Sequence, residues 1–472
     1  MKVNFLDNIM LLTDSYKPSH WFQYPPKTTK IRSYFESRGG EYEKTVMSGL
    51  QYLMKNYLEG EVITKAKIDE AISYYDEHLG PGIFNAEGWL NILRKHKGRL
   101  PVSIKAVPEG TVLPVRNVML TIENTDPEFP WLTNYLETLL SHVWYSSTTA
   151  TISREMKKII FTALEKSGDV GLIDYKLHDF GCRGVSSMET AATGGFAHLI
   201  NFKGTDTVPA LVLARTFYGC RMAGHSIPAA EHSTITTWKR SEEGKAYANM
   251  LEKFPTGLVA VVSDSWNIYN AVKNIWGGSL KTQVLGREGT LVIRPDSGDP
   301  EVVVPEVLDL LGKRFEYATN NKGYKVLDPH VRVIQGDGIN RHSLKGILDA
   351  VMARGWSADN VAFGSGGGLL QDCNRDTQKF AFKCSSAVVD GEEIDVFKEP
   401  ITDSGKNSKR GRLALVKHPM FKTVHGNEWA TVNEDDLRFG FGNWKNELVE
   451  VFRDGVILKE YTLDQLRERA AL

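Results

Sequence analysis

Between residues 170 and 390 the chain repeats one pattern of hydrophobic and polar positions. A short apolar run is followed by a loop rich in glycine, aspartate or serine, and then by a segment with helical spacing. Six apolar runs end in such loops, at Leu177–Gly181, Asn201–Asp206, Val261–Ser265, Ile293–Gly298, Val333–Gly338 and Phe363–Gly368. The alternation predicts an α/β fold with a parallel sheet, and the number and spacing of the units favour a (β/α) barrel.

This topology also predicts where a site would lie. In a barrel the loops that follow the strands share one face, and an open doubly wound sheet likewise gathers its strand ends in one crevice. Either arrangement brings together the polar residues of these loops, namely Asp179, Arg183, Asp206, His232, Arg294, Asp296, Asp337 and the glycines of 364–368.

The pattern is different before residue 150. Residues 29–35 alternate as a strand does, and Thr64 can cap a helix that ends near Leu79. We expect a β-rich unit with helices over 1–150.

Two further stretches have recognisable periodicity. Apolar spacing over residues 131–166 predicts two amphipathic helices that separate near Ser146–Ser147. After residue 390 strands and turns return, with an exposed basic loop expected over 403–412. Thr462 and Gln465 have the spacing of a capping box before a final helix.

Composition excludes several classes of protein. With 472 residues, 42% of them hydrophobic and 24% charged, the chain can bury a large core and form two domains. Lys plus Arg total 57 against 58 for Asp plus Glu, so no overall charge favours nucleic acid or an anionic membrane. The four cysteines lack the spacing of zinc sites or a disulfide framework, and no apolar stretch predicts secretion or membrane spanning. We expect a cytoplasmic protein.

The segment Gly364–Leu370 is the best candidate for a phosphate-binding loop. Glycines let backbone N–H groups approach an anion closely, and a helix beginning at Leu369 would add its positive end. A tight turn without a ligand is the alternative. The segment matches neither a Walker A loop nor a dinucleotide-binding fingerprint.

Two carboxylate-bearing turns follow other strands. Arg294–Pro300 places a cation, a carboxylate and a hydroxyl in one turn, which can bind a phosphate and ribose hydroxyls or can simply brace a loop. Asp337 lies between two glycines. The aspartates at the strand ends exceed what solubility needs, so a magnesium diphosphate or a polyhydroxyl substrate would account for them.

His232 is the candidate for proton or phosphate chemistry. It lies between Glu231 and Ser233, and imidazole titrates nearest neutrality among the side chains. A histidine that is merely hydrogen-bonded at a helix start is the alternative reading.

Five motifs together resemble one known family. They are 178–187, 201–207, 228–234, 293–298 and 335–338, and the likeness extends from Asp14–Lys17 to the final helix. In this order they are similar to the nicotinamide phosphoribosyltransferases, which are type II phosphoribosyltransferases. The resemblance implies a barrel-like domain over 151–394 and a second α+β domain formed by 1–150 together with 395–472.

The resemblance also implies an activity. Nicotinamide and 5-phosphoribosyl 1-pyrophosphate would give nicotinamide mononucleotide and pyrophosphate with Mg²⁺, in a homodimer whose sites lie at the subunit interface. ATP hydrolysis through a phosphohistidine would favour the product, in the service of NAD salvage.

Site residues are implied by position. The nicotinamide ring and amide would meet Phe180, Tyr16 of the second subunit, Asp206 and Arg294. Ribose and phosphate would meet Asp14, Arg183, Asp296, Gly336, Asp337, Gly366, Gly367 and, from the second subunit, Arg375. Pyrophosphate and ATP would meet Arg38, Lys383 and Lys398. His232 would carry the phosphate, and Glu231, Arg294 and Asp296 would complete the catalytic group.

Asp206 bears most directly on specificity. A carboxylate accepts a hydrogen bond from a carboxamide but repels the carboxylate of nicotinate. One departure from the family concerns ATP. An aspartate is expected four residues after Ser263 to support the histidine, and this chain has Asn267 there.

Three rival functions remain open. One is a phosphoribosyltransferase acting on nicotinate. Another is a sugar-phosphate isomerase or aldolase, for which Lys203 is the candidate Schiff-base lysine. The third is a binding protein without catalysis.

Overall fold

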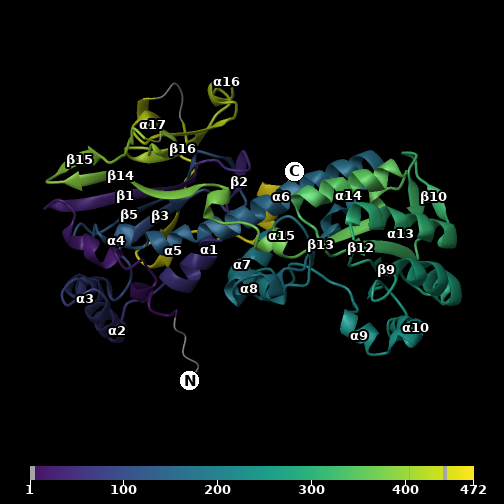
Figure 1. Ribbon diagram of the computed structural model, residues 1–472. Helices are drawn as coiled ribbons and strands as arrows, with labels where there is room; N and C mark the ends of the chain where they lie inside the picture. The colour runs from purple at the N-terminus through teal and green to yellow at the C-terminus, as the bar shows by residue number, and fades with distance from the viewer. Residues whose placement is uncertain (1–5, 403, 440–443) are drawn as a thin grey trace. The chain divides into compact units, whose positions relative to one another are not determined.

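A computed structural model describes residues 6–402, 404–439 and 444–472 (Figure 1). Its chain forms two compact units. The first contains the described residues up to Thr151, Phe217–Gly219 and those from Cys373 to Ala470, and the second contains Ile152–Thr216, Cys220–Asp372 and the last two residues. Residues 373–394 belong to the first unit rather than to the expected barrel-like region, because β14 (Phe380–Val389) pairs with β1 (Thr28–Ser37).

The second unit is built on a six-stranded sheet with the order β7-β6-β13-β12-β9-β8. All neighbouring pairs are parallel. The strands are β6 (Leu177–Asp179), β7 (Gly204–Thr205), β8 (Val259–Val262), β9 (Leu291–Arg294), β12 (Val331–Gln335) and β13 (Val361–Ser365). Each of the six predicted apolar runs therefore supplies one strand of a single parallel sheet, which confirms the α/β fold class.

The two edges of this sheet are linked by residues 225–230. Within that segment His225 forms a parallel bridge to Gly204 of β7, and Ala229 forms one to Ala260 of β8. The sheet thereby becomes an irregular barrel. Its interior is apolar, since Ala260, Val292 and Ile334 form one buried cluster.

Helices follow the strands of the second unit, as the alternating pattern predicts. Among those packed around the sheet (Figure 1), α13 and α14 contact each other. The α-helices that follow the strands are α7 (Met188–Leu199), α8 (Val208–Tyr218), α9 (His232–Thr236), α10 (Glu243–Lys253), α11 (Ile268–Asn270), α12 (Lys281–Leu285), α13 (Pro300–Phe315), α14 (Arg341–Ala353) and α15 (Gly367–Leu370), and η7 (Ala271–Ser279) lies between α11 and α12. A small hairpin, β10 (Tyr317–Thr319) and β11 (Lys325–Leu327), precedes β12.

The first unit is built on a seven-stranded sheet with the order β15-β14-β1-β5-β3-β18-β19. Besides β1 and β14 its strands are β3 (Val102–Ala106), β5 (Val118–Asn124), β15 (Glu392–Asp395), β18 (Val449–Arg453) and β19 (Val456–Ile457). Two further pairs are β2 (Lys44–Val46) with β4 (Val112–Pro114), and β16 (Leu413–Lys417) with β17 (Trp429–Asn433).

Helices and a hairpin cover the two faces of this sheet. Figure 1 shows α4 (Leu132–Tyr135) and α5 (Glu137–Ser141) on one face and the β16–β17 hairpin on the other. The other helices that contribute to the unit are α1 (Leu50–Leu53), α2 (Lys65–His78), α3 (Ala86–His96), the start of α6 (Val143–Ser167), α16 (Phe421–His425), α17 (Asp436–Phe439) and α18 (Leu463–Ala470).

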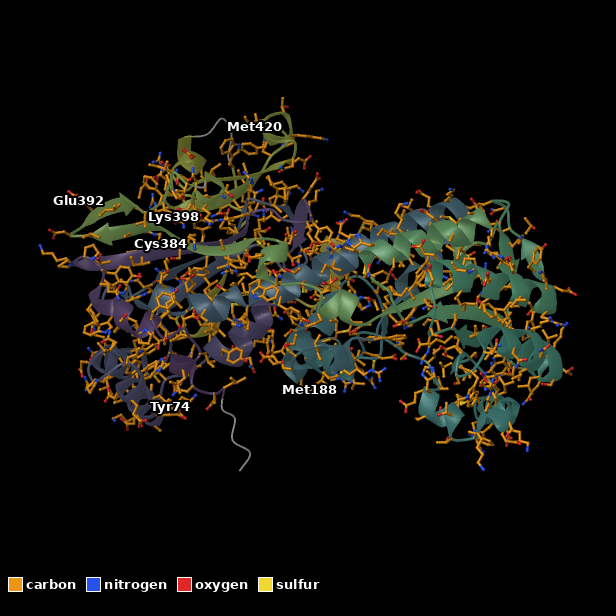
Figure 2. The ribbon with its side chains drawn as sticks, viewed as in Figure 1. Tyr74, Met188, Cys384, Glu392, Lys398 and Met420 are labelled. Atoms are coloured by element: carbon orange, nitrogen blue, oxygen red, sulfur yellow. The ribbon has the colours of Figure 1, made fainter. Side chains whose placement is uncertain are left out.

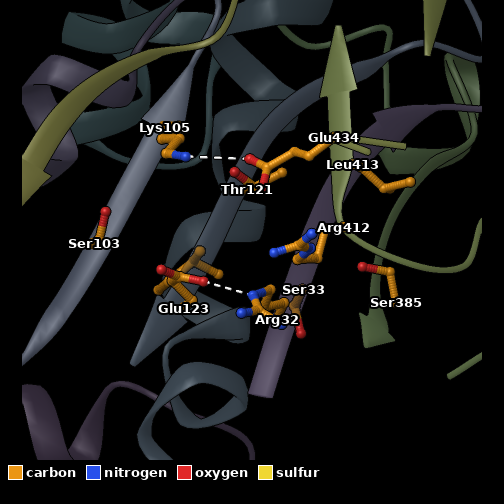
Figure 3. Close-up of a pocket in the computed structure, with 11 residues that line it drawn as sticks. Arg32, Ser33, Ser103, Lys105, Thr121, Glu123, Ser385, Arg412, Leu413 and Glu434 are labelled. Carbon is orange, nitrogen blue, oxygen red and sulfur yellow. Dashed lines mark hydrogen bonds and ion pairs between the residues drawn. The ribbon is translucent and has the colours of Figure 1, made fainter. Parts of the chain in front are cut away.

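A polar cavity of about 240 Å³ separates the sheet from the hairpin (Figure 3). Its charged walls neutralise one another: Arg32 Nε lies 2.7 Å from Glu123, and Lys105 Nζ lies 3.3 Å from Glu434. Arg412, the third cation of the lining, pairs with Asp435, so each charged group of the cavity belongs to an ion-pair network.

Most local predictions hold, and one is wrong. Thr64 caps α2 by accepting from the Lys67 N–H, and Thr462 and Gln465 form the capping box of α18. The expected break near Ser146–Ser147 does not occur, because α6 runs through both residues. The helices are instead interrupted at Leu136 and at His142.

The predicted loop over 403–412 is only partly exposed. Residues 405–407 are exposed, whereas Gly411 is buried and Lys409 is half-buried, and Asp403 lies outside the described residues. All four cysteines are free thiols. Among the helices that the structure describes, none is long and apolar enough to cross a membrane.

Candidate active site

The loops after β6 and β7 are joined by backbone hydrogen bonds at the carboxyl end of the barrel. Phe180 N donates to Ser365 O at 2.9 Å, and Asp206 N donates to Asp179 O at 2.9 Å. These bonds tie the ends of β6, β7 and β13 together. The side chains of Phe180 and Asp206 consequently lie at one end of the barrel, where the topology places Asp206.

The aromatic ring of Phe180 lies against two glycines. A Cβ atom at Gly364 would be 2.0 Å from Phe180 Cε2, and one at Gly336 would be 3.3 Å from the same atom. Only a residue without a side chain lets the ring lie on β13. The sequence suggests a phosphate-binding loop or a tight turn for the glycines of 364–368 and a ribose contact for Gly336, and it does not reveal Gly364 as the seat of the ring.

Phe180, Asp206 and Arg294 line a cavity of about 720 Å³ within the second unit. Its wall is largely apolar and includes Ala260 and Val292. Ser226, which also lines it, donates a hydrogen bond to Asp206 Oδ1. An apolar cavity with a few polar groups is the usual form of a small-molecule site.

His232 is the first residue of α9, and Asp264 supports it. Asp264 follows β8, its side chain is only 6% exposed, and its Oδ1 lies 3.0 Å from His232 Nε2. The His232 side chain is 46% exposed. The buried carboxylate therefore holds Nε2 of an imidazole that is otherwise about half exposed.

This geometry corrects the expectation about Asn267. The Asn267 side chain accepts from the Asn270 N–H at 2.9 Å and caps α11. The carboxylate that supports His232 is Asp264, so the absence of an aspartate at position 267 does not remove it. The sequence does not show which polar residue after β8 points toward the histidine. In the structure Asp264 does so, whereas the Asn267 side chain is directed to the Asn270 N–H.

A group of charges surrounds this pair. Arg294 Nη2 lies 3.4 Å from Asp296 Oδ2. Burial raises the pKa of the Asp296 carboxyl group. The positive charges of Arg294 and His232 oppose this shift, and the negative charges of Asp264 and Asp337 reinforce it. The five groups therefore lie within electrostatic reach of one another, and the shifted carboxyl is typical of a functional site.

The glycine-rich loop lies beside the Arg183 segment. A Cβ atom at Gly184 would be 3.6 Å from Gly367 N, and Ser365 Oγ donates to Ile339 O at 2.6 Å. The short helix α15 begins at Gly367 and has four residues, so it does not begin at Leu369 as expected. Its positive end is correspondingly weak, and a bound anion would rely on individual N–H groups and Arg183.

Asp179 is a buried acid whose role was not assigned from sequence. Burial raises its pKa to about 6, and the hydrogen bond from the Gly181 N–H opposes that shift. Asp179 Oδ1 accepts from Gly181 N at 2.7 Å. It therefore fixes the turn that carries Phe180, a function that no motif in the sequence indicates.

The remaining predicted residues lie in the first unit. Tyr16 and Lys383 line a cavity of about 460 Å³ together with Lys17 and Glu137. Lys398 (labelled in Figure 2) follows β15, where Val396 N donates to Ser385 O at 2.9 Å. This hydrogen bond holds the segment of Lys398 against β14.

Three more predicted residues are also in the first unit. Asp14 Oδ2 accepts from Thr138 Oγ1 at 2.6 Å, and Arg375 is 62% exposed on η9 (Arg375–Thr377). Arg38 lies beyond the end of β1, 3.4 Å from Glu36. The predicted site thus divides into a barrel set and a set of cations and aromatic groups on the other unit.

Comparisons with known proteins identify the fold and the family. Residues 175–454 match the nicotinate phosphoribosyltransferase (NAPRTase) family, and residues 8–104 match the nicotinamide phosphoribosyltransferase N-terminal domain. The chain belongs to the NAPRTase family. The resemblance seen in its motifs is thereby confirmed.

Individual relatives cover nearly the whole chain of this NAPRTase-family protein. A Nicotinamide phosphoribosyltransferase of Xanthomonas campestris is 51% identical over 99% of both chains, and one of Acinetobacter baylyi is 32% identical over 99% of this chain and 98% of its own. A crystal structure of nicotinate-nucleotide pyrophosphorylase from Pyrococcus furiosus has a TM-score of 0.61 at 16% identity, covering 100% of this chain and 96% of that one. A crystal structure of human Nicotinic Acid Phosphoribosyltransferase has a TM-score of 0.58 at 15% identity, covering 98% of this chain and 93% of that one.

The NAPRTase-family chain is a phosphoribosyltransferase, which is a pentosyltransferase enzyme. The binding-protein and sugar-phosphate isomerase or aldolase readings are therefore wrong. Lys203 precedes β7, and its Nζ lies 2.8 Å from Asp174, so the lysine is ion-paired at the amino end of the strand.

Proposed function

We propose that this enzyme transfers the phosphoribosyl group to nicotinamide. The pyridine nitrogen would attack C1 of 5-phosphoribosyl 1-pyrophosphate while the bond from C1 to the pyrophosphate oxygen breaks, which gives nicotinamide mononucleotide for NAD salvage. The observation that carries the proposal is that Phe180 and Asp206, which follow β6 and β7, line one largely apolar cavity of the barrel.

Phe180 supports a planar substrate. A pyridine ring stacked on its face gains about 1 kcal/mol beyond the buried area. The second face of the substrate would meet Tyr16 of the second copy, which is 57% exposed and therefore accessible to a partner. Arg294 would lie beside the same pocket.

Asp206 selects the amide. Its Oδ1 already accepts from Ser226, and a carboxylate offers further lone pairs to the two N–H groups of a carboxamide. The carboxylate of nicotinate has no proton to donate and would be repelled. This argument, together with the 51% identity to a relative named for nicotinamide, favours nicotinamide over nicotinate.

Ribose and phosphate would occupy the adjoining loops. Asp296, Gly336 and Asp337 follow β9 and β12, and a carboxylate there can accept from ribose hydroxyls. The 5′-phosphate would meet Arg183 and the N–H groups of Gly366 and Gly367. Asp14, and Arg375 of the second copy, would complete this part of the site.

His232 would couple ATP to the transfer. Asp264 would accept the proton on Nε2, which leaves the lone pair on Nδ1 of a side chain that is 46% exposed. Nδ1 would attack the γ-phosphorus of ATP as ADP leaves, and water would later release inorganic phosphate from the histidine. Glu231 accepts a hydrogen bond from Ser233 and flanks the imidazole, and Asp264 would stabilise the imidazolium.

The cations of the first unit suit pyrophosphate and ATP. Burial lowers the pKa of Lys383, and Arg38, Lys398 and Lys17 lower it further, while Glu137 opposes the shift. Such a group of mutually close cations favours a polyanion. In a homodimer these residues and the barrel set would form shared sites.

Magnesium would bind together with the substrate. Among the described residues no group of three or more His, Cys, Asp and Glu side chains is arranged to hold a metal ion alone. The raised pKa of Asp296, caused first by burial and then reinforced by Asp264 and Asp337, nevertheless indicates excess negative charge that a cation would offset. Asp296 and Asp337 would contact the ion or its waters, and the ion would neutralise charge on the leaving pyrophosphate.

The four free thiols fit a reducing compartment, so we expect the enzyme in the cytoplasm. The proposal is tested by incubating the full chain with 5-phosphoribosyl 1-pyrophosphate, Mg²⁺ and nicotinamide, with and without ATP. We expect nicotinamide mononucleotide and pyrophosphate in equal amounts, and more of both with ATP. Product formation from nicotinate alone would refute the proposed substrate.

A further inference from the structure

Glu36 is a buried carboxylate that holds two cations. Its side chain is 3% exposed, Arg38 Nε lies 3.4 Å from its Oε1, and Lys409 Nζ pairs with its Oε2. Alternation along β1 places Tyr34 and Glu36 on one face of the sheet, and Arg38 follows directly after the strand. The Tyr34 hydroxyl accepts from Lys409 N at 2.8 Å, which fixes the backbone of the loop that carries Lys409.

This cluster carries more positive than negative charge. Lys383 is the cross-strand partner of Tyr34, and Arg38 and Lys398 are near enough to lower the pKa of Lys383 after the larger effect of its burial. Glu36 is thus the carboxylate that pairs directly with Arg38 and Lys409 beside these two lysines. Glu137, which also acts on Lys383, pairs with Lys17, so these two carboxylates do not neutralise Arg38, Lys383, Lys398, Lys409 and Lys17 together.

The fold also leaves a donor unused. Arg38 Nη2 is buried and has no hydrogen-bond partner in the part of the chain that the structure describes. Buried donors in native proteins are nearly always paired, so an unpaired guanidinium nitrogen beside other cations points to an anionic ligand. Lys409 has further N–H donors besides the one directed at Glu36.

We propose that Glu36 is a positioning residue that holds Arg38 and Lys409 as a pair of diphosphate-binding cations, with Lys409 a further ligand of the pyrophosphate group. The inference rests on the proposed function, which places pyrophosphate at Arg38, Lys383 and Lys398. Glu36 itself touches neither substrate nor product. It would act by keeping the two cations from separating.

Two effects of removing its charge have opposite signs. Glu36→Gln removes a negative charge near an anion, and long-range electrostatics alone would then tighten the binding of pyrophosphate. Loss of the buried ion pairs would instead let Arg38 and Lys409 repel each other and leave the binding geometry. A charge-assisted hydrogen bond contributes enough that we expect the positioning effect to dominate.

The test measures binding of magnesium pyrophosphate to the full chain by calorimetry, and the KM values of both substrates. We expect Glu36→Gln and Lys409→Met each to weaken pyrophosphate binding by at least about tenfold and to raise the KM for 5-phosphoribosyl 1-pyrophosphate. The KM for nicotinamide should stay within about twofold, because a general loss of folding would change both KM values. Glu123→Gln is the matched control, since Glu123 pairs with Arg32 in the same sheet and lies outside the cluster (Figure 3).

Pyrophosphate binding by Glu36→Gln that equals or exceeds that of the wild type would overturn the inference. Should Glu36→Gln fail to fold, Lys409→Met decides, and unchanged affinity in that variant would equally overturn it. Wild-type protein that binds no pyrophosphate and forms no mononucleotide would refute the proposed function itself. The two failures are therefore distinguishable.

Discussion

Asp264 Oδ1 lies 3.0 Å from Nε2 of His232, with the carboxylate buried and the imidazole half exposed. Because a carboxylate only accepts hydrogen bonds, this arrangement favours the proton on Nε2 and leaves the lone pair on Nδ1. It gives an exposed histidine a fixed ring orientation and a partner for positive charge, which are the two requirements of a transient phosphate carrier.

Removal of the imidazole should separate ATP coupling from transfer. We expect His232→Ala to abolish stimulation by ATP while slow synthesis without ATP persists, because the proposed site assigns the ring, the amide and the ribose to other residues. Initial rates with and without ATP measure this. His330→Ala is the control. His330 also pairs with an aspartate, Asp328, at 2.7 Å, but it precedes β12 and so lies at the amino end of the strand, away from the proposed site. Full ATP stimulation in His232→Ala would exclude the phosphohistidine.

Substitution of Asp264 should weaken phosphorylation of His232. Asp264→Asn retains the size of the side chain but cannot neutralise an imidazolium, so the phosphoenzyme formed from labelled ATP should fall by at least about tenfold. Asn267→Ala should leave labelling within about twofold, because Asn267 only caps α11. If Asn267→Ala lost the labelling and Asp264→Asn kept it, Asn267 would be the supporting residue and the assignment to Asp264 would be wrong.

Shared sites predict complementation between two inactive variants. Arg375→Ala removes a proposed site residue of the first unit. Asp296→Asn removes a proposed site residue of the second unit. If each site combines units from two copies, random mixed dimers restore about one quarter of the sites. Activity is measured after the chains are unfolded and refolded together, with each variant refolded alone as the control. Mixtures that remain inactive would place each complete site within one copy.

The buried Asp179 predicts a pH dependence of stability. Its pKa is raised to about 6, primarily by burial, so its contribution to stability is fully present below about pH 4 and is lost as the pH rises through 6. The loss is on the order of 3 kcal/mol at most. Asp179→Asn carries no such charge, so its Tm relative to the wild type should increase between pH 5 and pH 8. Asp349→Asn, at an exposed helical ion pair, should show a constant difference. A constant difference for Asp179→Asn would mean that its carboxyl group titrates normally.

The sequence predicted the barrel because each strand is a short apolar run followed by a polar loop. The same topology predicted that Asp206, Arg294 and Asp296 converge, although Asp206 is far from the other two in the chain. Such convergence follows from parallel strands alone. It needs no knowledge of individual side-chain contacts.

Other features depend on contacts that a linear pattern does not contain. The break expected at Ser146–Ser147 is absent because Ser147 Oγ donates to Ser48 O and Thr151 Oγ1 to Ser147 O, which satisfies the polar groups inside a helix. The contact between Gly364 and the Phe180 ring joins two distant segments, so the sequence around Gly364 indicates only a phosphate-binding loop or a tight turn. These are tertiary effects that override local signals.

The choice between nicotinamide and nicotinate tests the central claim most directly. Both bases at equal concentration are supplied to the full chain with 5-phosphoribosyl 1-pyrophosphate, Mg²⁺ and ATP, and the ratio of the two mononucleotides gives the ratio of kcat/KM. We predict a preference for nicotinamide of at least about 100-fold, which Asp206→Ser should largely remove. An equal yield of the two products, or an excess of nicotinate mononucleotide, would contradict the account.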